Sequence, residues 1–245
     1  MILIIGSSHD DIIYFESIIK NKKEEIILNK FHAINGTIFN QAVMLLHDVH
    51  SSYISSSLTT YLINKYFVLL IFVVGKCTSA TSDVRLGDIA ISRRIMFGDI
   101  NLTDISTTQL CQIPGLPRVF DVQQDVIETL EKALSNRTYS RYIEANFISA
   151  NVHFKKPEDL RFIREGDNIL GFNSSVVLDS EAGGIALAGY LTNIPVIAIK
   201  AVGSVLGKTP TTDDYLLVLK QYASIGRAIV STIGEFSRND VIRTQ

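Results

Sequence analysis

The chain has 245 residues, of which 47% are hydrophobic and 20% are charged, and its formal net charge is −2. A chain of this length can bury a large core within one domain. The small net charge, with both signs interspersed along the chain, excludes a strongly basic protein and gives no indication of nucleic-acid binding. The longest apolar run, Tyr66 to Val74, is too short to cross a bilayer. We therefore expect a protein that binds neither nucleic acid nor membrane.

The sequence begins directly on an apolar segment, without the basic residues that open a signal peptide. This favours the cytoplasm as its location. The two cysteines, Cys77 and Cys111, are too few for a disulfide framework or a cysteine-rich metal cluster. We expect no metal site.

In the first half of the chain, apolar segments alternate with polar segments. A polar stretch, Ser7 to Asp11, can cap the first helix, and Asn35-Gly36 is a typical hairpin turn. The predicted elements are a strand over Ile2–Ile5, a helix through Lys20, a hairpin of Ile26–Phe31 and Thr37–Leu46, a helix over Ser51–Lys65, and strands over Tyr66–Val74 and Asp88–Ser92.

The second half continues the alternation. Its predicted elements are a loop over Asn101–Pro117, helices over Val122–Leu134 and Pro157–Arg164, strands over Ile143–Ser149, Val176–Leu178 and Pro195–Val202, a helix that follows Glu181, and a long helix over Tyr215–Phe236. No linker or repeat interrupts the pattern. It predicts one domain over residues 1–245, a three-layer α/β/α sandwich with a mixed central sheet.

Two acids, Asp179 and Glu181, follow the buried strand Val176–Leu178 and precede a helix rich in small residues. Open α/β sheets bind their ligands at the carboxyl ends of their strands, so these acids are candidates for a binding site. Acids are also favoured at helix N-termini by the helix dipole, and a capping pair without chemistry is the alternative.

This acidic segment resembles the acid-x-Met-Glu-Ala signature of the nucleoside phosphorylase and nucleosidase superfamily. Four further stretches are similar, in order, to the 5′-methylthioadenosine/S-adenosylhomocysteine nucleosidases of that superfamily. They are the first strand with Gly6, Asp10 and Asp11; the glycine-rich segment Val74–Ser79 followed by Arg85–Ile89; the loop Gln112–Pro117; and the strand Pro195–Val202. The resemblance covers nearly the whole chain and implies that superfamily's fold.

The resemblance assigns catalytic and ribose-binding roles to four positions. Glu181 takes the place of the acid that grips the ribose hydroxyls, and Asp11 that of a glutamate that activates water. Asp179 replaces another glutamate near the water. Asp11 and Asp179 are each one methylene shorter than the glutamate that they replace. Ser204 stands where the relatives carry the aspartate that protonates the purine, and a serine hydroxyl is a poor general acid.

The remaining expected substrate-binding residues also depart from the pattern of the relatives. Lys200 replaces an arginine, and Ser180 replaces a methionine beneath the sugar. Phe154 or His153 takes the place of the aromatic residue that stacks on the purine. The alternatives are that Phe154 is a plain core aromatic and that His153 is a substitute acid. Lys76 and Cys77 complete the expected site.

The implied reaction is hydrolysis of the N-glycosidic bond of a purine nucleoside, which releases adenine without a metal or an organic cofactor. Neither Ser7–Asp11 nor Val74–Ser79 contains an arginine to hold phosphate, which favours water over phosphorolysis. Ser204 leaves a second hypothesis open: a catalytically inactive homologue that binds a nucleoside or a protein partner. The resemblance also implies a homodimer, because the loop corresponding to Gln112–Pro117 lies at a subunit interface in the relatives.

Overall fold

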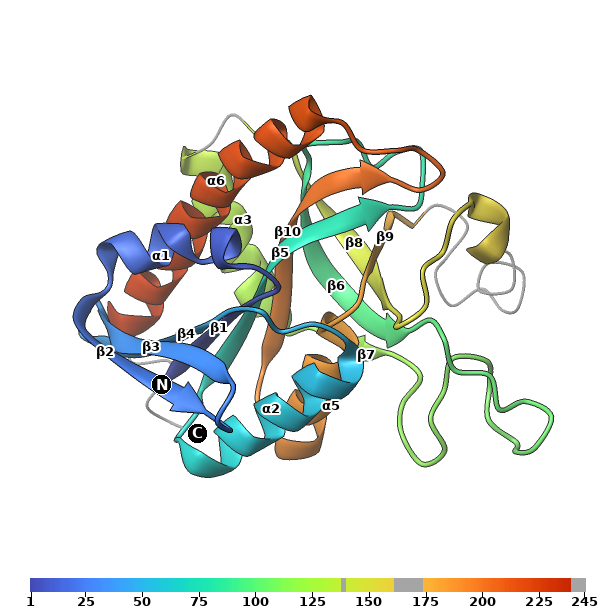
Figure 1. Ribbon diagram of the computed structural model, residues 1–245, viewed down its shortest axis with the longest axis horizontal. Helices are drawn as coiled ribbons and strands as arrows, with labels where there is room; N and C mark the ends of the chain where they lie inside the picture. Colours follow the sequence, from blue (N-terminus) through green and yellow to red (C-terminus); the bar gives the residue numbers. More distant parts are fainter. Residues whose placement is uncertain (138–139, 161–173, 239–245) are drawn as a thin grey trace.

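The computed structural model describes residues 1–137, 140–160 and 174–238. A mixed ten-stranded sheet forms its centre, and helices cover both faces of that sheet (Figure 1). The predicted fold class, a three-layer α/β/α sandwich, is confirmed.

The strands are β1 (Ile2–Gly6), β2 (Lys20–Ile27), β3 (Phe31–Ile38), β4 (Gln41–Leu46), β5 (Leu70–Ser79), β6 (Ile89–Phe97), β7 (Phe120–Asp121), β8 (Tyr142–Ser149), β9 (Val176–Asp179) and β10 (Val196–Val205). The α-helices are α1 (Ile13–Ile18), α2 (Ser52–Lys65), α3 (Gln124–Arg137), α5 (Ala182–Thr192) and α6 (Thr212–Arg238). Two short 3-10 helices cover His9–Asp11 and Pro157–Leu160.

Part of the sheet closes on itself. β5 pairs with β1, β9 and β10, while β10 also pairs with β6, and β8 joins β6 to β9. β1, β4, β5 and β10 run parallel to one another, so their carboxyl ends lie at the same edge of the sheet.

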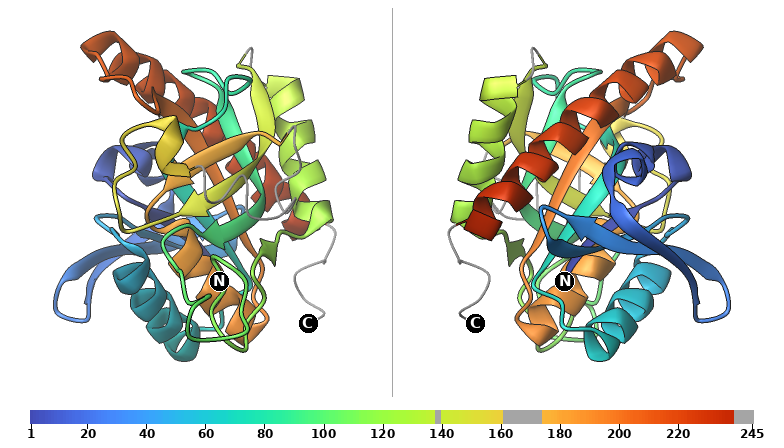
Figure 2. Two further views of the ribbon diagram at one scale, coloured as in Figure 1. Left: turned by 90° about the vertical axis from the view of Figure 1, so that its right-hand side faces the viewer. Right: turned by 90° about the vertical axis from the view of Figure 1, so that its left-hand side faces the viewer.

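Apolar side chains on the two faces of the sheet form separate cores. On one face, Ile2, Ile4 and Phe72 belong to a cluster that includes residues of α1, α3 and α6. On the other, Leu3 and Ile5 belong to a cluster with residues of α2 and α5. Figure 2 shows α6 lying along the sheet on the side opposite α2 and α5. Because successive strand side chains point to opposite faces, one apolar strand can serve both cores.

The predicted hairpin turn at Asn35-Gly36 is wrong, because both residues lie inside β3. The chain turns instead at residues 28–30 and at 39–40, where Leu28, Asn29, Phe39 and Asn40 have positive φ. Gly36 is needed for a close approach rather than a turn, since a Cβ there would lie 2.4 Å from the carbonyl oxygen of Lys20.

Other differences concern the ends of elements. The first helix ends at Ile18, and Lys20 already begins β2. The strands predicted to end at Val74 and Ser92 continue to Ser79 and Phe97. Each extension adds residues that pair with a neighbouring strand, and local hydropathy does not predict such pairing.

The remaining predicted strands and helices lie within a few residues of the observed ones, and residues 101–117 form a loop without helix or strand. Of the short helix predicted over Pro157–Arg164, residues 161–164 lie outside the described residues. In the ranges that the structure describes, no helix has the length and apolar character needed to cross a membrane.

Candidate active site

A cavity of about 430 Å³ opens where β1, β5, β8, β9 and β10 end or pass close together. Eight of the ten predicted site residues line it: Lys76, Cys77, His153, Phe154, Asp179, Ser180, Glu181 and Ser204. The other two, Asp11 and Lys200, are buried behind its wall. Residues that are far apart in the sequence therefore converge on one site, as the resemblance implies.

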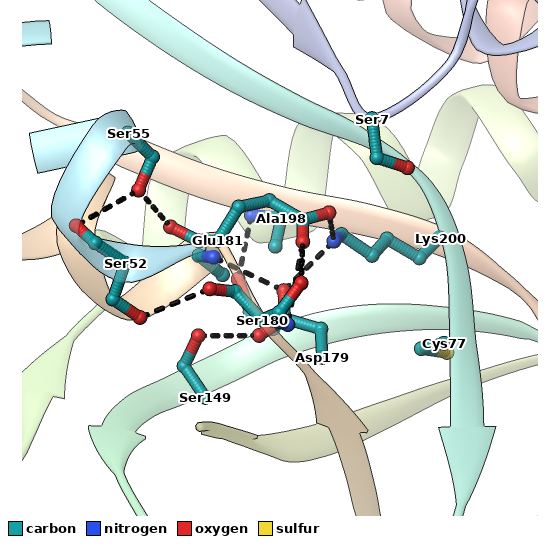
Figure 3. Close-up of polar contacts among 12 residues, drawn as sticks. Ser7, Ser52, Ser55, Cys77, Ser149, Asp179, Ser180, Glu181, Ala198 and Lys200 are labelled. Carbon is teal, nitrogen blue, oxygen red and sulfur yellow. Dashed lines mark hydrogen bonds and ion pairs between the residues drawn. The ribbon is translucent and has the colours of Figure 1, made fainter. Parts of the chain in front are cut away.

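The centre of the wall is a buried group of two carboxylates and one ammonium (Figure 3). Lys200 Nζ lies 2.7 Å from Asp179 Oδ2 and also contacts Glu181 Oε1. Ser180 donates from its hydroxyl to Glu181 Oε2 at 2.8 Å. All three charged side chains are almost completely buried, and the single ammonium can balance only one of the two negative charges.

Burial and mutual charge set the proton affinities of this group. Burial raises the pKa of Glu181, and the nearby charge of Asp179 raises it further against the opposing effect of Lys200. Burial alone would lower the pKa of Lys200, but Asp179 and Glu181 raise it well above its usual value. Lys200 therefore stays protonated at neutral pH and holds the negative charge of the two acids in the cavity wall.

Hydrogen bonds and small residues fix the loop that carries these acids. Asp179 Oδ1 accepts from Ser149 Oγ at 2.6 Å, and its Oδ2 accepts from the backbone of Ala182 at 3.1 Å. Asp179 thus caps the start of α5, as the alternative interpretation expected of both acids, whereas the Glu181 side chain makes no capping bond. Asp179 also lines the cavity.

Helix α2 supports the same loop from the other side. Ser52 and Ser55 donate to the carbonyl oxygens of Ser180 and Glu181, at 3.0 and 2.9 Å. A Cβ at Gly184 would lie 2.1 Å from the Ser52 carbonyl, so glycine there allows α5 to approach α2. Gly184 and the two serines thereby hold the loop that carries Glu181 against α2.

Asp11, the residue expected to activate water, lies beneath the loop that follows β1. Its Oδ2 accepts from the backbone of Ser7 and Ser8, both at 2.8 Å, and from Ser7 Oγ at 3.0 Å. Ser7 and Ser8 line the cavity and Asp11 does not. The Asp11 carboxylate is therefore linked to the cavity by its hydrogen bonds to these two serines.

The expected purine side of the cavity carries hydroxyl groups and rings. Ser204 Oγ lies 2.7 Å from Thr78 Oγ1, so the residue in the position of the general acid is hydrogen-bonded to a second hydroxyl. His153 is exposed at the rim. Phe154 is half-buried and packs against the cluster that contains Leu178 and Leu206. Phe154 therefore presents an apolar surface that a purine can stack on.

Eight lining residues were not among the predicted site residues, and they include Ser7, Ser8 and His50. Ser7 and Ser8 follow β1, and His50 lies between β4 and α2. Their position after the carboxyl ends of parallel strands was the available signal. Within the described residues, no group of three or more His, Cys, Asp or Glu side chains is arranged to hold a metal ion.

Comparisons with known proteins agree on one family. A family model for the phosphorylase superfamily matches residues 2–234. Similar curated proteins are named 5′-methylthioadenosine/S-adenosylhomocysteine nucleosidase. One, from Buchnera aphidicola subsp. Acyrthosiphon pisum (strain Tuc7), is 25% identical over 186 residues, which cover 76% of this chain and 77% of the relative. Another, from Listeria welshimeri, is 23% identical and covers 94% of this chain and 98% of the relative.

Solved structures extend the likeness to the fold. The Neisseria meningitidis nucleosidase, solved in complex with methylthio-immucillin-A, has a TM-score of 0.84 at 16% identity and covers 96% of this chain and 98% of that chain. Helicobacter pylori futalosine hydrolase has a TM-score of 0.82 at 15% identity and covers 96% and 97%. At sequence identities this low, the TM-scores establish a shared architecture and no shared chemistry.

Proposed function

The chain belongs to the phosphorylase superfamily, and we propose that it hydrolyses the N-glycosidic bond of a purine nucleoside of the 5′-methylthioadenosine or S-adenosylhomocysteine type. The observation that carries this proposal is the buried Asp179–Lys200–Glu181 group in the wall of the cavity. The volume of that cavity, about 430 Å³, is within the usual range of small-molecule sites.

Cleavage of the bond pushes the ribose toward an oxocarbenium ion, which a fixed negative charge stabilises. Glu181 supplies that charge from the wall, and its Oε2 already accepts a hydrogen bond from Ser180. A ribose hydroxyl can donate to the same carboxylate. Lys200 holds Glu181 and Asp179 in place without entering the cavity.

Water is the proposed nucleophile. Lys76 is the one Lys or Arg side chain among the described residues that line the cavity. A phosphate nucleophile is usually held by arginine forks that match its oxygens, and a single flexible ammonium matches them poorly. This supports hydrolysis over phosphorolysis.

Ser204 supports a second candidate function, a nucleoside-binding homologue without turnover. Its hydroxyl is hydrogen-bonded to that of Thr78 at 2.7 Å. Unlike a carboxylic acid, a hydroxyl does not readily release a proton near neutral pH. Loss of one positioned acid lowers the rate by a factor of about 10²–10⁴. The same site therefore fits either a slow enzyme or a binding protein without turnover.

The test is adenine release from methylthioadenosine and S-adenosylhomocysteine by the wild type, Glu181→Gln and Ser204→Asp. A working hydrolase predicts turnover in the wild type that is lost in Glu181→Gln. No turnover in the wild type, with turnover appearing in Ser204→Asp, would favour the binding homologue. No turnover in any of the three would refute the assignment of this substrate class.

A homodimer with twofold symmetry is part of the proposal. The loop Gln112–Pro117 lies away from the active-site cavity and is held by Gln112, which donates to the carbonyl of Leu116 at 2.9 Å. Nearby in the chain, the apolar side chain of Ile105 is 81% exposed, and a second copy of this chain would cover it at such an interface. Light scattering on the purified protein tests this state.

We also propose a cytoplasmic location, which fits two free, buried cysteines, Cys77 and Cys111.

A further inference from the structure

We propose that Ser7 is a catalytic residue that carries a proton from the attacking water to Asp11. This inference rests on the proposed hydrolysis and adds a residue to it. The problem that it solves is geometric: the acid that the resemblance assigns to water activation does not line the cavity, whereas Ser7 does.

The hydrogen bonds around Asp11 define the direction of the proton. Asp11 is 3% exposed, and its Oδ2 accepts from Ser7 Oγ at 3.0 Å. A serine hydroxyl has one hydrogen and two lone pairs. Since the hydrogen points to Asp11, the lone pairs are left to accept from a molecule in the cavity. A water bound there donates to Ser7, as an activated nucleophile must.

Two glycines leave room for this pair. A Cβ at Gly75 would lie 2.9 Å from Asp11 Oδ2 and 3.2 Å from Ser7 Oγ, and the φ of Gly75 is +135°. A Cβ at Gly6 would lie 2.9 Å from the Cβ of Asp11. The backbones of β1 and β5 thus approach the Ser7–Asp11 pair as closely as they can, which fixes the hydroxyl relative to the cavity.

The two backbone amides separate the role of Ser7 in catalysis from a role in folding. The backbone groups of Ser7 and Ser8 donate to Asp11 Oδ2, both at 2.8 Å, and they do not depend on the serine side chain. Replacement of Ser7 by alanine therefore removes the path for the proton and leaves the loop its other two bonds to Asp11.

The proposed step balances as follows. The water oxygen forms a bond to C1′ of the ribose while the bond from C1′ to the purine nitrogen breaks and its electron pair leaves with the purine. One water proton moves to Ser7 Oγ as the Ser7 proton moves to Asp11. The purine anion takes a proton from solvent, and Asp11 returns its proton to solvent. The sum is nucleoside plus water giving free sugar plus purine.

Steady-state hydrolysis by Ser7→Ala tests the step, with Ser17→Ala as the matched control. Ser17 is exposed on α1 and its hydroxyl donates to the carbonyl of Tyr14 at 2.6 Å, away from the cavity. We expect kcat of Ser7→Ala to fall by about 10²-fold, the low end for loss of a base. The KM, the Kd for adenine and the Tm should stay near the wild-type values. Ser17→Ala should match the wild type throughout.

A double variant, Ser7→Ala with Asp11→Glu, gives the decisive readout. The longer acid extends into the space of the missing hydroxyl and reaches water directly, so kcat should recover by about tenfold or more over Ser7→Ala. An active wild type with unchanged kcat in Ser7→Ala, or a double variant without recovery, would overturn the Ser7 step alone. A wild type that releases no adenine would overturn the proposed hydrolysis and the Ser7 step together.

Discussion

Replacement of Lys200 by methionine should strongly destabilise the fold. The substitution keeps an apolar chain of similar length and removes the ammonium that lies 2.7 Å from Asp179 and contacts Glu181. The three side chains are 0%, 1% and 4% exposed, so water cannot replace the lost partner. Removal of one partner of a buried ion pair costs about 3–5 kcal/mol, which lowers the Tm of a chain of this size by about 6–20 °C.

The loss of stability in Lys200→Met should depend on pH in a defined direction. The pKa of Glu181 is already raised from its ordinary 4.5 in the wild type. In Lys200→Met it must rise further because the compensating cation is gone. An acid whose pKa is higher in the folded state contributes stability below its unfolded pKa, and this is lost as pH rises through the folded value. The difference between variant and wild type should therefore be largest near neutral pH and shrink toward pH 4.5.

Urea denaturation of the wild type, Lys200→Met and Lys200→Arg at several pH values measures this effect. The arginine variant keeps the positive charge and should lose much less stability than the methionine variant. A loss below about 1 kcal/mol in Lys200→Met, or a loss that does not change with pH, would refute the view that Lys200 stabilises the two buried carboxylates.

Two further outcomes follow from the same structure. Gly75→Ala should lower the Tm more than Gly115→Ala, because both have positive φ but only the former would bring a Cβ within 2.9 Å of Asp11; equal losses in a thermal melt would contradict the close packing. Burial raises the pKa of the Cys77 thiol, and it raises that of Cys111 to about 11. Neither cysteine should react with iodoacetamide at pH 8 until the protein unfolds, and mass spectrometry that finds native Cys77 alkylated would refute this.

The sequence predicted well those features that depend on local hydropathy. The apolar run before Asp179 predicted a buried strand, and the small residues after Glu181 predicted a tightly packed helix. Because ligands bind at strand ends, the placement of both acids at a cavity followed.

Features that depend on distant parts of the chain were not predictable in the same way. Asn35-Gly36 has the composition of a turn, but Gly36 is required by the carbonyl of Lys20 sixteen positions away. Lys200 was assigned to substrate binding, yet it contacts carboxylates on a different element, from behind the cavity wall. Ser7 gave no motif, and only its hydrogen bond to Asp11 and its place in the cavity distinguish it from other serines.

The most direct test of the central claim is adenine release from methylthioadenosine, measured in phosphate-free buffer and again with phosphate added. Hydrolysis predicts the same rate in both buffers and a free sugar as the second product, because water is the nucleophile in either case. Release that requires phosphate and yields a sugar 1-phosphate would contradict hydrolysis and would show that Lys76 and the hydroxyl groups of this cavity hold a phosphate after all.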